Sequence, residues 1–532
     1  MTRCSLICSL FLLIYVNARS QAVGDSIAKT TYNILNYGAR CDAKTCNTVA
    51  IQRAVDDCHR NGGGRILVPP GSFITGTIRL YSNMELYLEP GSILCGSKDN
   101  NDYLYQKDFG FSGPGAGIKT GILVAQNEEN ISVAGFGKIF GNGTLSMYMD
   151  SLQQGADFDR AYTRQKQDYM NPAWGRADGP VLWKGNYDDR PGVMIIFSGC
   201  KNIRLSTIKL EESPNWTIAF LNSTDIKVTG ITIDNNMNIP NSDGIDMYDS
   251  KNITISDCII NAGDDAIAVV SSSNISATNC VLHSRSCGIR VGYNVFNDNN
   301  SGNLLFNNII IYDSNRGIGI FQRRKGNMDN MIFSNIIIGT RLHSGQWWGH
   351  GEPIHISSVP GLGSTESGSI RNVRFSNISA TSESGVLIYA SKKGLIRDIQ
   401  FDHLDLTLKP GALTAGYGGN IDLRPVNNMA LGIFSHSIPA FYSNSTDELV
   451  IRDMNVRWES GLPAYFNHAI ECDGFESLTI DGLAEFFIKK QNGTDATVYL
   501  QNGVTARISN IRSSDEKKKL VKKDNVIHLV SE

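Results

Sequence analysis

The chain has 532 residues, with 49 Lys and Arg against 52 Asp and Glu, so its net charge is −3 at pH 7. This balance argues against a nucleic-acid-binding protein and a polybasic membrane-surface protein, and a content of 41% hydrophobic and 19% charged residues argues against disorder. Length alone allows several domains, so internal repeats decide whether the chain forms one structural unit.

The first twenty residues are predicted to form a secretory signal peptide. Arg3 gives a positive start, residues 6–16 form a mostly apolar run, and Ala18-Arg19-Ser20 supplies a small-x-small cleavage pattern. A membrane anchor is the alternative for this segment, but the run is too short to span a bilayer. We therefore expect a secreted, extracellular protein that has no membrane association after signal removal.

The cysteines and sequons fit an exported protein. Cys41, Cys46 and Cys58 lie close together in the sequence and are candidates for disulfides near the mature N-terminus. Nine cysteines follow the signal, so at least one is unpaired within the chain, and the lack of a Cys-x-x-Cys pair argues against a zinc site. Sequons that permit N-glycosylation include Asn142, Asn215, Asn222, Asn252, Asn444 and Asn492.

One phrase, Asn-Ile-x-Ile/Phe-Ser-Asn-x-x-Ile, recurs from about residue 200. Its first apolar positions are 203, 226, 253, 275, 304, 331, 373 and 399, with weaker copies at 449, 478 and 506. Each unit holds short runs of β-branched residues broken by Gly, Asn, Asp and Ser, with no helical pattern and no Leu-x-x-Leu-x-Leu frame. The repeat therefore predicts an all-β parallel β-helix, whose coils stack at about 4.8 Å.

The open N-terminal end of such a solenoid needs a cover. Asn47 or Thr48 would cap a short helix that ends at the Gly-rich run after Asn61. The apolar face of this capping helix is predicted to be Ile51, Ala54, Val55 and Cys58.

These features predict one β-helix domain over residues 21–512, after a signal at 1–20 and with an N-terminal cap at about 30–100. Loops at about 142–192 and 339–370 break the period, and long loops on a rigid solenoid often carry function. Residues 513–532, which include DEKKKLVKKD, are predicted to be a solvated charged tail. A capped solenoid is expected to be a monomer.

Three aspartates form the strongest chemical pattern. Asp243 and Asp264 are 21 residues apart, close to one coil, so we expect them on neighbouring rungs of one face. Asp265 faces the same groove only if the chain bends at Gly263 or Asp264. Repulsion within the group should raise at least one pKa, and carboxyls about 5 to 10 Å apart bracket the separation in inverting glycosidases. Single Asp residues are common in turns, so the prediction depends on the joint pattern.

Several strings resemble glycoside hydrolase family 28, the polygalacturonase family of pectin-degrading enzymes. They are NSDGID at 241–246, GDD at 263–265, SPNW at 213–216, and NYGARCDAKTCNTVAIQRAVDDC with GGGRILVPPGSF near the start. The resemblance covers most of the mature chain. It implies a single-stranded, right-handed, pectin-lyase-like β-helix that hydrolyses α-1,4-galacturonosyl linkages of pectin by single displacement with inversion.

The resemblance also implies roles for individual residues. Asp264 would be the general acid, and Asp243 and Asp265 would activate the attacking water. No metal or organic cofactor is implied, and the partner is a pectic polysaccharide rather than a nucleic acid. The implied substrate-binding residues are Asn241, Asp246, Arg290 and Arg316.

Two family motifs are altered. The motif Gly-His-Gly-x-Ser-x-Gly reads SCGIRVG at 286–292, so Cys287 replaces His and Arg290 replaces Ser. The motif Arg-Ile-Lys reads RGI at 316–318, so Ile318 replaces Lys. A thiol is a weak hydrogen-bond partner, and an isoleucine cannot pair a carboxylate. Replacements for the lost groups are Arg290, Arg323 or Arg324 for the charge and His283 for the imidazole.

These departures leave alternatives open. The enzyme still cuts polygalacturonate with a rearranged clamp, prefers another pectic backbone such as rhamnogalacturonan, or is weakly active. Rival classes are a calcium-dependent pectate-lyase-like enzyme and a non-catalytic carbohydrate-binding β-helix. The long loops suggest one closed groove end and exo attack, with a candidate wall formed by Trp347, Trp348, His350 and Glu352.

Overall fold

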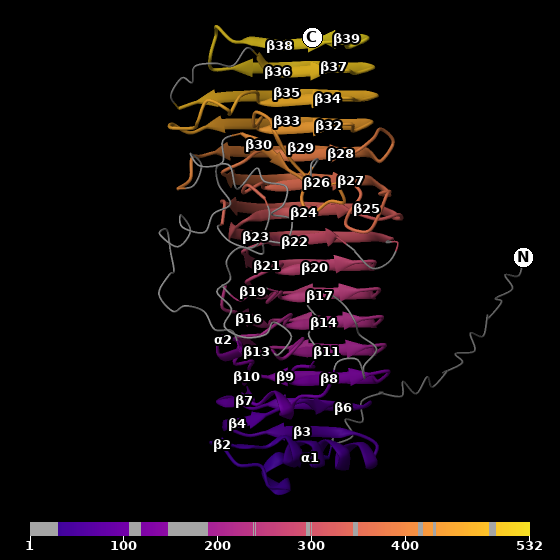
Figure 1. The fold of residues 1–532 in the computed structure, drawn as a ribbon, viewed down its shortest axis with the longest axis vertical. Helices are drawn as coiled ribbons and strands as arrows, with labels where there is room; N and C mark the ends of the chain where they lie inside the picture. Colours follow the sequence, from indigo (N-terminus) through magenta and orange to yellow (C-terminus); the bar gives the residue numbers. More distant parts are fainter. Residues whose placement is uncertain are drawn as a thin grey trace, which may run out of the picture.

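The structure is a computed structural model of the whole chain (Figure 1). The predicted signal, residues 147–189 of the first loop, Trp347, Trp348 and Asn492 lie outside the described residues. Within the described part, no helix has the length and apolar character needed to cross a membrane. The described residues are 30–105, 119–146, 190–237, 239, 241–293, 298, 300–343, 349–412, 419–428, 432–488 and 496–531.

The chain forms a right-handed parallel β-helix, as predicted, with coils stacked from the N-terminal end to the C-terminal end (Figure 1). One strand from each coil joins a parallel 14-stranded sheet. Its strands are β5 (Ile78–Arg79), β8 (Leu123–Gln126), β11 (Ile195–Ser198), β14 (Ile218–Leu221), β17 (Ile245–Tyr248), β20 (Ile267–Val270), β22 (Cys287–Gly292), β24 (Arg316–Gln322), β26 (Ile354–Ser358), β28 (Val386–Ala390), β32 (Phe441–Asn444), β34 (Ile470–Asp473), β36 (Ala496–Gln501) and β38 (Lys519–Asp524).

A second parallel sheet holds the rest of each coil, as two strands in early coils and as one long bent strand from β21 onward. Its strands are β1 (Thr31–Asn33), β2 (Asp42–Cys46), β3 (Gly64–Val68), β4 (Gly71–Thr75), β6 (Met84–Leu88), β7 (Ser92–Gly96), β9 (Glu129–Gly135), β10 (Lys138–Phe140), β12 (Lys201–Ser206), β13 (Lys209–Glu211), β15 (Thr224–Thr229), β16 (Thr232–Asp234), β18 (Lys251–Ser256), β19 (Ile259–Ala262), β21 (Ser273–Ser284), β23 (Ser301–Ser314), β25 (Asn327–Thr340), β27 (Ser369–Ser382), β29 (Ile396–Leu408), β33 (Glu448–Trp458), β35 (Ser477–Phe487), β37 (Thr505–Ser513) and β39 (His528–Ser531).

The predicted repeat positions form one inward-facing column of the core. Each pairs with the next across a rung, from Ile203 with Ile226 to Leu478 with Ala506. A neighbouring column stacks four phenylalanine rings with centroids 4.6 to 5.1 Å apart, a favourable distance for offset rings. These rings belong to Phe306, Phe333, Phe375 and Phe401.

The recurring Asn of the repeat has a backbone reason. Asn274, Asn303 and Asn330 have φ values of 57°, 56° and 58°, a left-handed conformation that Asn tolerates better than most residues. Their side-chain amides also bond along the stack, at 2.9 Å from Asn303 to Asn274 and 2.7 Å from Asn330 to Asn303. A turn residue thus both bends each coil and ties it to the next.

The N-terminal cap is the predicted helix, α1 (Thr48–Arg60), which stops before Asn61. Its buried residues are Ile51, Ala54, Val55 and Cys58, as the spacing predicted. Asn47 occupies the N-cap position, but its side chain makes no capping bond. It accepts from Arg40 N at 2.7 Å and donates to the Thr45 carbonyl at 2.8 Å. Short helices η1 (Ile34–Tyr37), η2 (Asn100–Asp102) and α2 (Gly143–Ser146) complete the helical content of the described chain.

Two expectations differ from the structure. Residues 519–531, predicted to lie in a solvated tail, form β38 and β39 and continue both sheets, because they pair with β36 and β37 of the preceding coil. Lys518 is buried against Glu485, with a nitrogen–oxygen distance of 2.7 Å. The nine described cysteines are all free thiols, so no disulfide staples the N-terminal region.

Candidate functional site

The three predicted aspartates meet at the starts of two adjacent strands in the middle of the 14-stranded sheet. Asp243 stands just before β17, and Asp264 and Asp265 stand just before β20. One carboxylate oxygen of each lies within 4.8 Å of the others. The residues are 2%, 7% and 4% exposed, so the group is almost sealed from solvent.

The pairing of these aspartates differs by one residue from the sequence expectation. Ile245 pairs with Ile267, so one coil is 22 residues here, and this register sets Asp243 opposite Asp265 rather than Asp264. Asp264 joins the group because the chain bends before it. A Cβ at Gly263 would lie 2.4 Å from the Ile239 carbonyl, so only glycine fits the bend.

Burial and mutual repulsion dominate the electrostatics. Burial, and then the nearby carboxylates, raise the pKa of Asp243 and of Asp264 well above the ordinary value. The guanidinium of Arg290 opposes this rise in both. The Asp243 Oδ1 atom has no hydrogen-bond partner, although it is buried. Asp243 and Asp264 therefore keep their protons at pH values where ordinary aspartates are ionised.

Arg290 is the counter-charge of the group. It occupies the same outward column as Asp246, with Ala268 on the rung between them. Its Nε donates to Asp265 Oδ2, its Nη1 donates to the Gly292 carbonyl at 2.6 Å, and its Nη2 lies 3.8 Å from Asp246. The predicted clamp for a substrate carboxylate is thus engaged within the protein.

Asp246 lies beneath the group and is fully buried. Neither of its carboxylate oxygens has a hydrogen-bond partner, and burial raises its pKa well above the ordinary value despite Arg290. Its strand neighbours Ile245 and Met247 belong to the core, so Asp246 faces outward toward the site.

Asn241 also joins the site, as its position in the motif implied. Its Nδ2 donates to Asp264 Oδ2 at 3.4 Å, and its Oδ1 accepts from Arg190 at 3.1 Å. Arg190 is buried and donates to the Pro214 carbonyl at 3.0 Å. Sequence reasoning missed Arg190, because it lies at the end of a loop with no recognised motif.

The altered motif at 286–292 changes how Asp265 is held. Cys287 is buried, and burial raises the pKa of its thiol, so a neutral thiol replaces the expected imidazole. Its backbone N–H instead donates to Asp265 Oδ1 at 3.0 Å, while Arg290 binds the other oxygen. Backbone and guanidinium together bind both oxygens of this carboxylate.

The second altered motif, RGI at 316–318, does not place its third residue in the groove. Ile318 belongs to the core, so it never faces the groove, and the next outward position on β24 is Gly319, which pairs with Arg290. Arg316 pairs with Cys287 across the rung, and its Nε lies 3.3 Å from Glu352. The outward positions of this rung therefore carry no lysine equivalent.

The other candidate replacements for the lost imidazole and lysine are His283, Arg323 and Arg324, and they have other surroundings. His283 lies 3.5 Å from Asp313 and packs against Tyr312, with ring centroids 4.8 Å apart. Arg323 is fully buried and binds backbone carbonyls. Arg324 is partly exposed, and its Nε has no hydrogen-bond partner. The contacts of His283 and Arg323 described here are therefore with residues other than the three aspartates.

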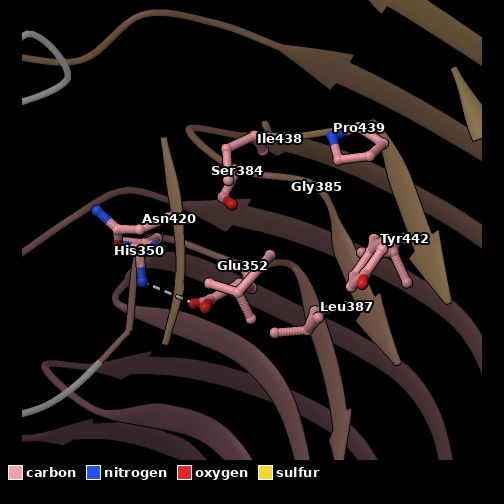
Figure 2. Close-up of a pocket in the computed structure, with 11 residues that line it drawn as sticks. His350, Glu352, Ser384, Gly385, Leu387, Asn420, Ile438, Pro439 and Tyr442 are labelled. Atoms are coloured by element: carbon pink, nitrogen blue, oxygen red, sulfur yellow. Dashed lines mark hydrogen bonds between the residues drawn. The ribbon is translucent and has the colours of Figure 1, made fainter. Parts of the chain in front are cut away.

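His350 and Glu352 lie beyond Arg316 and line a small pocket of about 10 Å³ (Figure 2). The His350 backbone N–H donates to Glu352 at 2.8 Å. The remaining lining residues are Ser384, Gly385, Val386, Leu387, Asn420, Ile421, Ile438, Pro439 and Tyr442.

Among the described residues, Asp243, Asp264 and Asp265 are also the one group whose spacing suits a metal ion. Hard cations such as Ca²⁺ bind carboxylate oxygens at about 2.3–2.6 Å. Arg290 already places a positive charge on Asp265, so the group is arranged around an internal cation.

Fold and site together define a parallel β-helix with a buried carboxylate cluster at the starts of adjacent strands of one sheet, an arrangement suited to acid–base chemistry. Residues 175–414 match the model of Glycosyl hydrolases family 28, the family that the sequence motifs resemble. That part of the chain contains every site residue named above except Asn420, Ile421, Ile438, Pro439 and Tyr442.

Individual relatives agree with this family. An exo-poly-α-D-galacturonosidase of Dickeya chrysanthemi is 28% identical over 47% of this chain and 44% of that protein. A probable polygalacturonase of Vitis vinifera is 28% identical over 44% of this chain and 42% of that protein. The chain thus spans less than half the length of these curated relatives. A family 28 exopolygalacturonase structure from Yersinia enterocolitica shares the fold, with a TM-score of 0.58, 17% identity, and 86% of this chain and 78% of that chain covered.

Proposed function

We propose that this protein is a secreted glycoside hydrolase that cleaves α-1,4-galacturonosyl linkages of pectin. The observation that supports this most is the unequal environment of the buried aspartates. Asp264 has a raised pKa and few partners, whereas Asp265 accepts bonds from Arg290 and Cys287 that stabilise a carboxylate anion. Such a pair supplies one proton donor and one base at the same pH.

In the proposed reaction, Asp264 protonates the glycosidic oxygen as the bond to the anomeric carbon breaks. Asp265, assisted by Asp243, takes a proton from the water that attacks that carbon. Asn241 and Asp246 orient the substrate, and no metal or organic cofactor takes part. General acid–base steps of this kind contribute about 10²–10⁴ in rate.

Inversion of the anomeric configuration is part of the proposal and rests on the family resemblance. The carboxylate oxygens approach within 4.8 Å, which is closer than the roughly 6.5–9.5 Å typical of inverting enzymes. Proton NMR of the first product formed tests the step. A product with the configuration opposite to the substrate supports single displacement, and a retained configuration contradicts it.

A second candidate substrate is another pectic backbone, such as rhamnogalacturonan. The observation that favours it is the state of the site cations, because Arg290 binds Asp265 and Arg316 binds Glu352. Neither guanidinium is arranged to receive a galacturonate carboxylate, and Gly319 stands where an outward lysine would be needed.

A reducing-end assay tests the proposal on both polymers, with Asp264→Asn as the matched control. Release from polygalacturonate that the substitution abolishes supports the first substrate, and release from rhamnogalacturonan alone moves the substrate. An unsaturated, ultraviolet-absorbing product would instead indicate a lyase. Binding without cleavage by the folded protein would contradict hydrolysis and favour a carbohydrate-binding role.

Secretion, a monomeric state and glycosylation belong to the same proposal. Intact mass of the exported protein should show loss of residues 1–20, and size-exclusion chromatography should show one chain. Asn142 and Asn215 are buried, and Asn252 donates to Asp225 at 3.0 Å in the turn ladder, so these sequons are poor acceptors. Asn222 is exposed and is the best candidate for a glycan.

A further inference from the structure

A hollow lies on the outer face of the second sheet, near the C-terminal end of the solenoid. It has a volume of about 500 Å³ and is formed by β33, β35 and β37, three neighbouring strands of successive coils (Figure 1). We call it the C-terminal hollow. Its lining residues are Asp453, Asn455, Gly482, Leu483, Ala484, Asn510, Ile511 and Arg512.

The C-terminal hollow is separate from the buried aspartates. It lies on the other sheet, and six inter-strand steps separate β20, which follows Asp265, from β34, which belongs to the coil of β35. At about 4.8 Å for each step, the two places are roughly 29 Å apart along the solenoid axis. A ligand in the hollow therefore cannot touch the aspartates with the same sugar unit.

Two small residues of β35 create the hollow. Each long strand from β21 to β37 bends at a residue with positive φ, and Gly482 is the one bend residue in this series that has no side chain. The others are Asn279, Asn308, Asn335, Asn377, His403, Asp453 and Asn510. Leu483 belongs to the core, so Ala484 faces outward, yet it is only 4% exposed because it forms the floor.

The rim of the hollow offers hydrogen-bond acceptors. A Cβ at Gly482 would lie 2.8 Å from Asp453 Oδ1, so this carboxylate oxygen reaches over the glycine. Asn455 and Asn510 each use their amide nitrogen within the protein, as donors to Asp405 at 2.7 Å and to Asp481 at 2.8 Å. Their amide oxygens can therefore accept from a ligand. We call the oxygens of Asp453, Asn455 and Asn510 the acceptor rim.

One cation stands at the other side of the hollow. Arg512 pairs with Ala484 across the rung and is exposed, and within the described part of the chain it forms no ion pair. Phe486 lies two residues after Ala484 on the same face and is 37% exposed. The hollow thus combines oxygen acceptors, a guanidinium and an exposed aromatic ring.

This division of polarity selects the chemistry of the ligand. Hydroxyl groups would donate to the acceptor rim, and the carboxylate of Asp453 disfavours an anion at that side. A carboxylate would bind the guanidinium of Arg512, which can hold it with two parallel bonds. A neutral sugar would leave Arg512 unused, and an inorganic anion would leave the acceptor rim unused. A sugar acid satisfies both sides.

We propose that the C-terminal hollow is a second, non-catalytic binding site for an acidic saccharide chain, with one uronate carboxylate on Arg512 and ring hydroxyls on the acceptor rim. The choice of a pectic polymer as this chain rests on the proposed hydrolase function. Because the two sites are far apart, only a long chain reaches both, and the hollow then raises the local concentration of polymer at the aspartates.

Affinity electrophoresis in gels that contain polygalacturonate tests the site. The polymer should retard the wild-type protein, and Arg512→Glu should raise the apparent Kd about tenfold or more, because binding through two sites is lost. The matched control Arg507→Glu makes the same charge change at an exposed arginine of β37 before its bend, and should leave the Kd unchanged. A fully methyl-esterified polymer, which has no free carboxylate, should not distinguish Arg512→Glu from the wild type.

Kinetics separates the hollow from the aspartates. Arg512→Glu should raise KM for the polymer with kcat unchanged, whereas kcat/KM for trigalacturonate should stay the same, because so short an oligomer cannot reach both sites. Arg512→Gln, which keeps the reach of the side chain without its charge, should show a smaller loss in the same direction.

The outcomes distinguish this site from the proposed function. No retardation of the wild type, or equal retardation of the Arg512→Glu and Arg507→Glu variants, overturns the site. Slower cleavage of trigalacturonate by Arg512→Glu also overturns it, since the effect would then act through the aspartates or the fold. Retardation that depends on Arg512, in a protein that cuts no pectic polymer, supports the site and overturns the hydrolase.

Discussion

Removal of Arg290 should destabilise the protein in a strongly pH-dependent way. The substitution Arg290→Leu keeps an apolar side chain at the position but takes away the guanidinium that pairs with Asp265 and lies 3.8 Å from Asp246. Its column neighbours Ala268 and Gly319 are too small to fill the gap with another polar group. Breaking a buried pair from one side typically costs about 3–5 kcal/mol, so we expect a loss of that size at pH 7.

The sign of the pH dependence follows from the raised pKa values. Asp243, Asp246 and Asp264 hold protons in the folded chain at a pH where the unfolded chain, with pKa values near 3.9, has lost them. Each such group makes the free energy of unfolding fall by about 1.4 kcal/mol per pH unit as the pH rises from the unfolded to the folded pKa. Arg290 lowers all three pKa values. Without it these pKa values rise further, so the free energy of unfolding keeps falling over a wider pH range. The variant should therefore be weakest at neutral pH.

Urea unfolding of the wild type and Arg290→Leu at pH 4 and pH 7 measures this effect. The difference in free energy of unfolding should be small at pH 4, where the carboxyls are largely protonated, and should reach several kcal/mol at pH 7. Arg371→Leu breaks an exposed pair with Asp329 and should cost about 0–1 kcal/mol at either pH. A loss below about 1 kcal/mol at pH 7, or one equal at both pH values, would refute the electrostatic reasoning.

Four further predictions follow from the core, the site and the thiols. Phe333→Ala removes the middle of the ring stack and should cost about 3–5 kcal/mol in urea unfolding, whereas a loss under 1 kcal/mol would mean that the stack repacks. Asp264→Asn should lower kcat by about 10²–10⁴ with a smaller change in KM, and near-normal kcat would exclude it as the acid. Wild-type kcat should fall on the alkaline side as the raised pKa of Asp264 is passed, and a flat alkaline limb would contradict that role. Alkylation in denaturant without reductant should label all nine cysteines that follow the signal, and a shortfall of two would reveal a disulfide.

The periodic part of the fold was predictable residue by residue. The first apolar positions of the repeat pair across every rung from Ile203 to Ala506, because one side-chain column must stay inside a continuous core. The buried face of α1 was predictable for a similar reason, because its apolar residues must also face the core. The last coil was missed because β38 carries more lysine than apolar residues, so its strand is set by pairing with β36 rather than by its own pattern.

The site was predictable as a cluster but not in its contacts. The aspartate motifs located Asp243, Asp264 and Asp265, while the one-residue difference between a 21- and a 22-residue coil changed which two stand opposite each other. Arg290 was expected to bind substrate, because a sequence does not show that its guanidinium points back to Asp265. The antiparallel hairpin of β30 (Asn420–Asp422) and β31 (Ile433–Ser435) was missed because it lies between repeat units and has no periodicity of its own.

The altered motif residues are best understood as one rearrangement rather than as separate losses. An arginine reaches from its own rung to Asp265 and toward Asp246 only if its neighbours are small, and Ala268 and Gly319 flank Arg290 in that column. With the guanidinium in place, Asp265 has a partner on one oxygen and the Cys287 N–H on the other, so an imidazole at position 287 is no longer needed to hold it. The buried cluster then carries four carboxyls and one internal cation, which favours protonated acids inside the site. Arg290, which the sequence offered as a clamp for a substrate carboxylate, instead holds Asp265, the proposed base. The proposed substrate therefore depends directly on the electrostatics of Arg290.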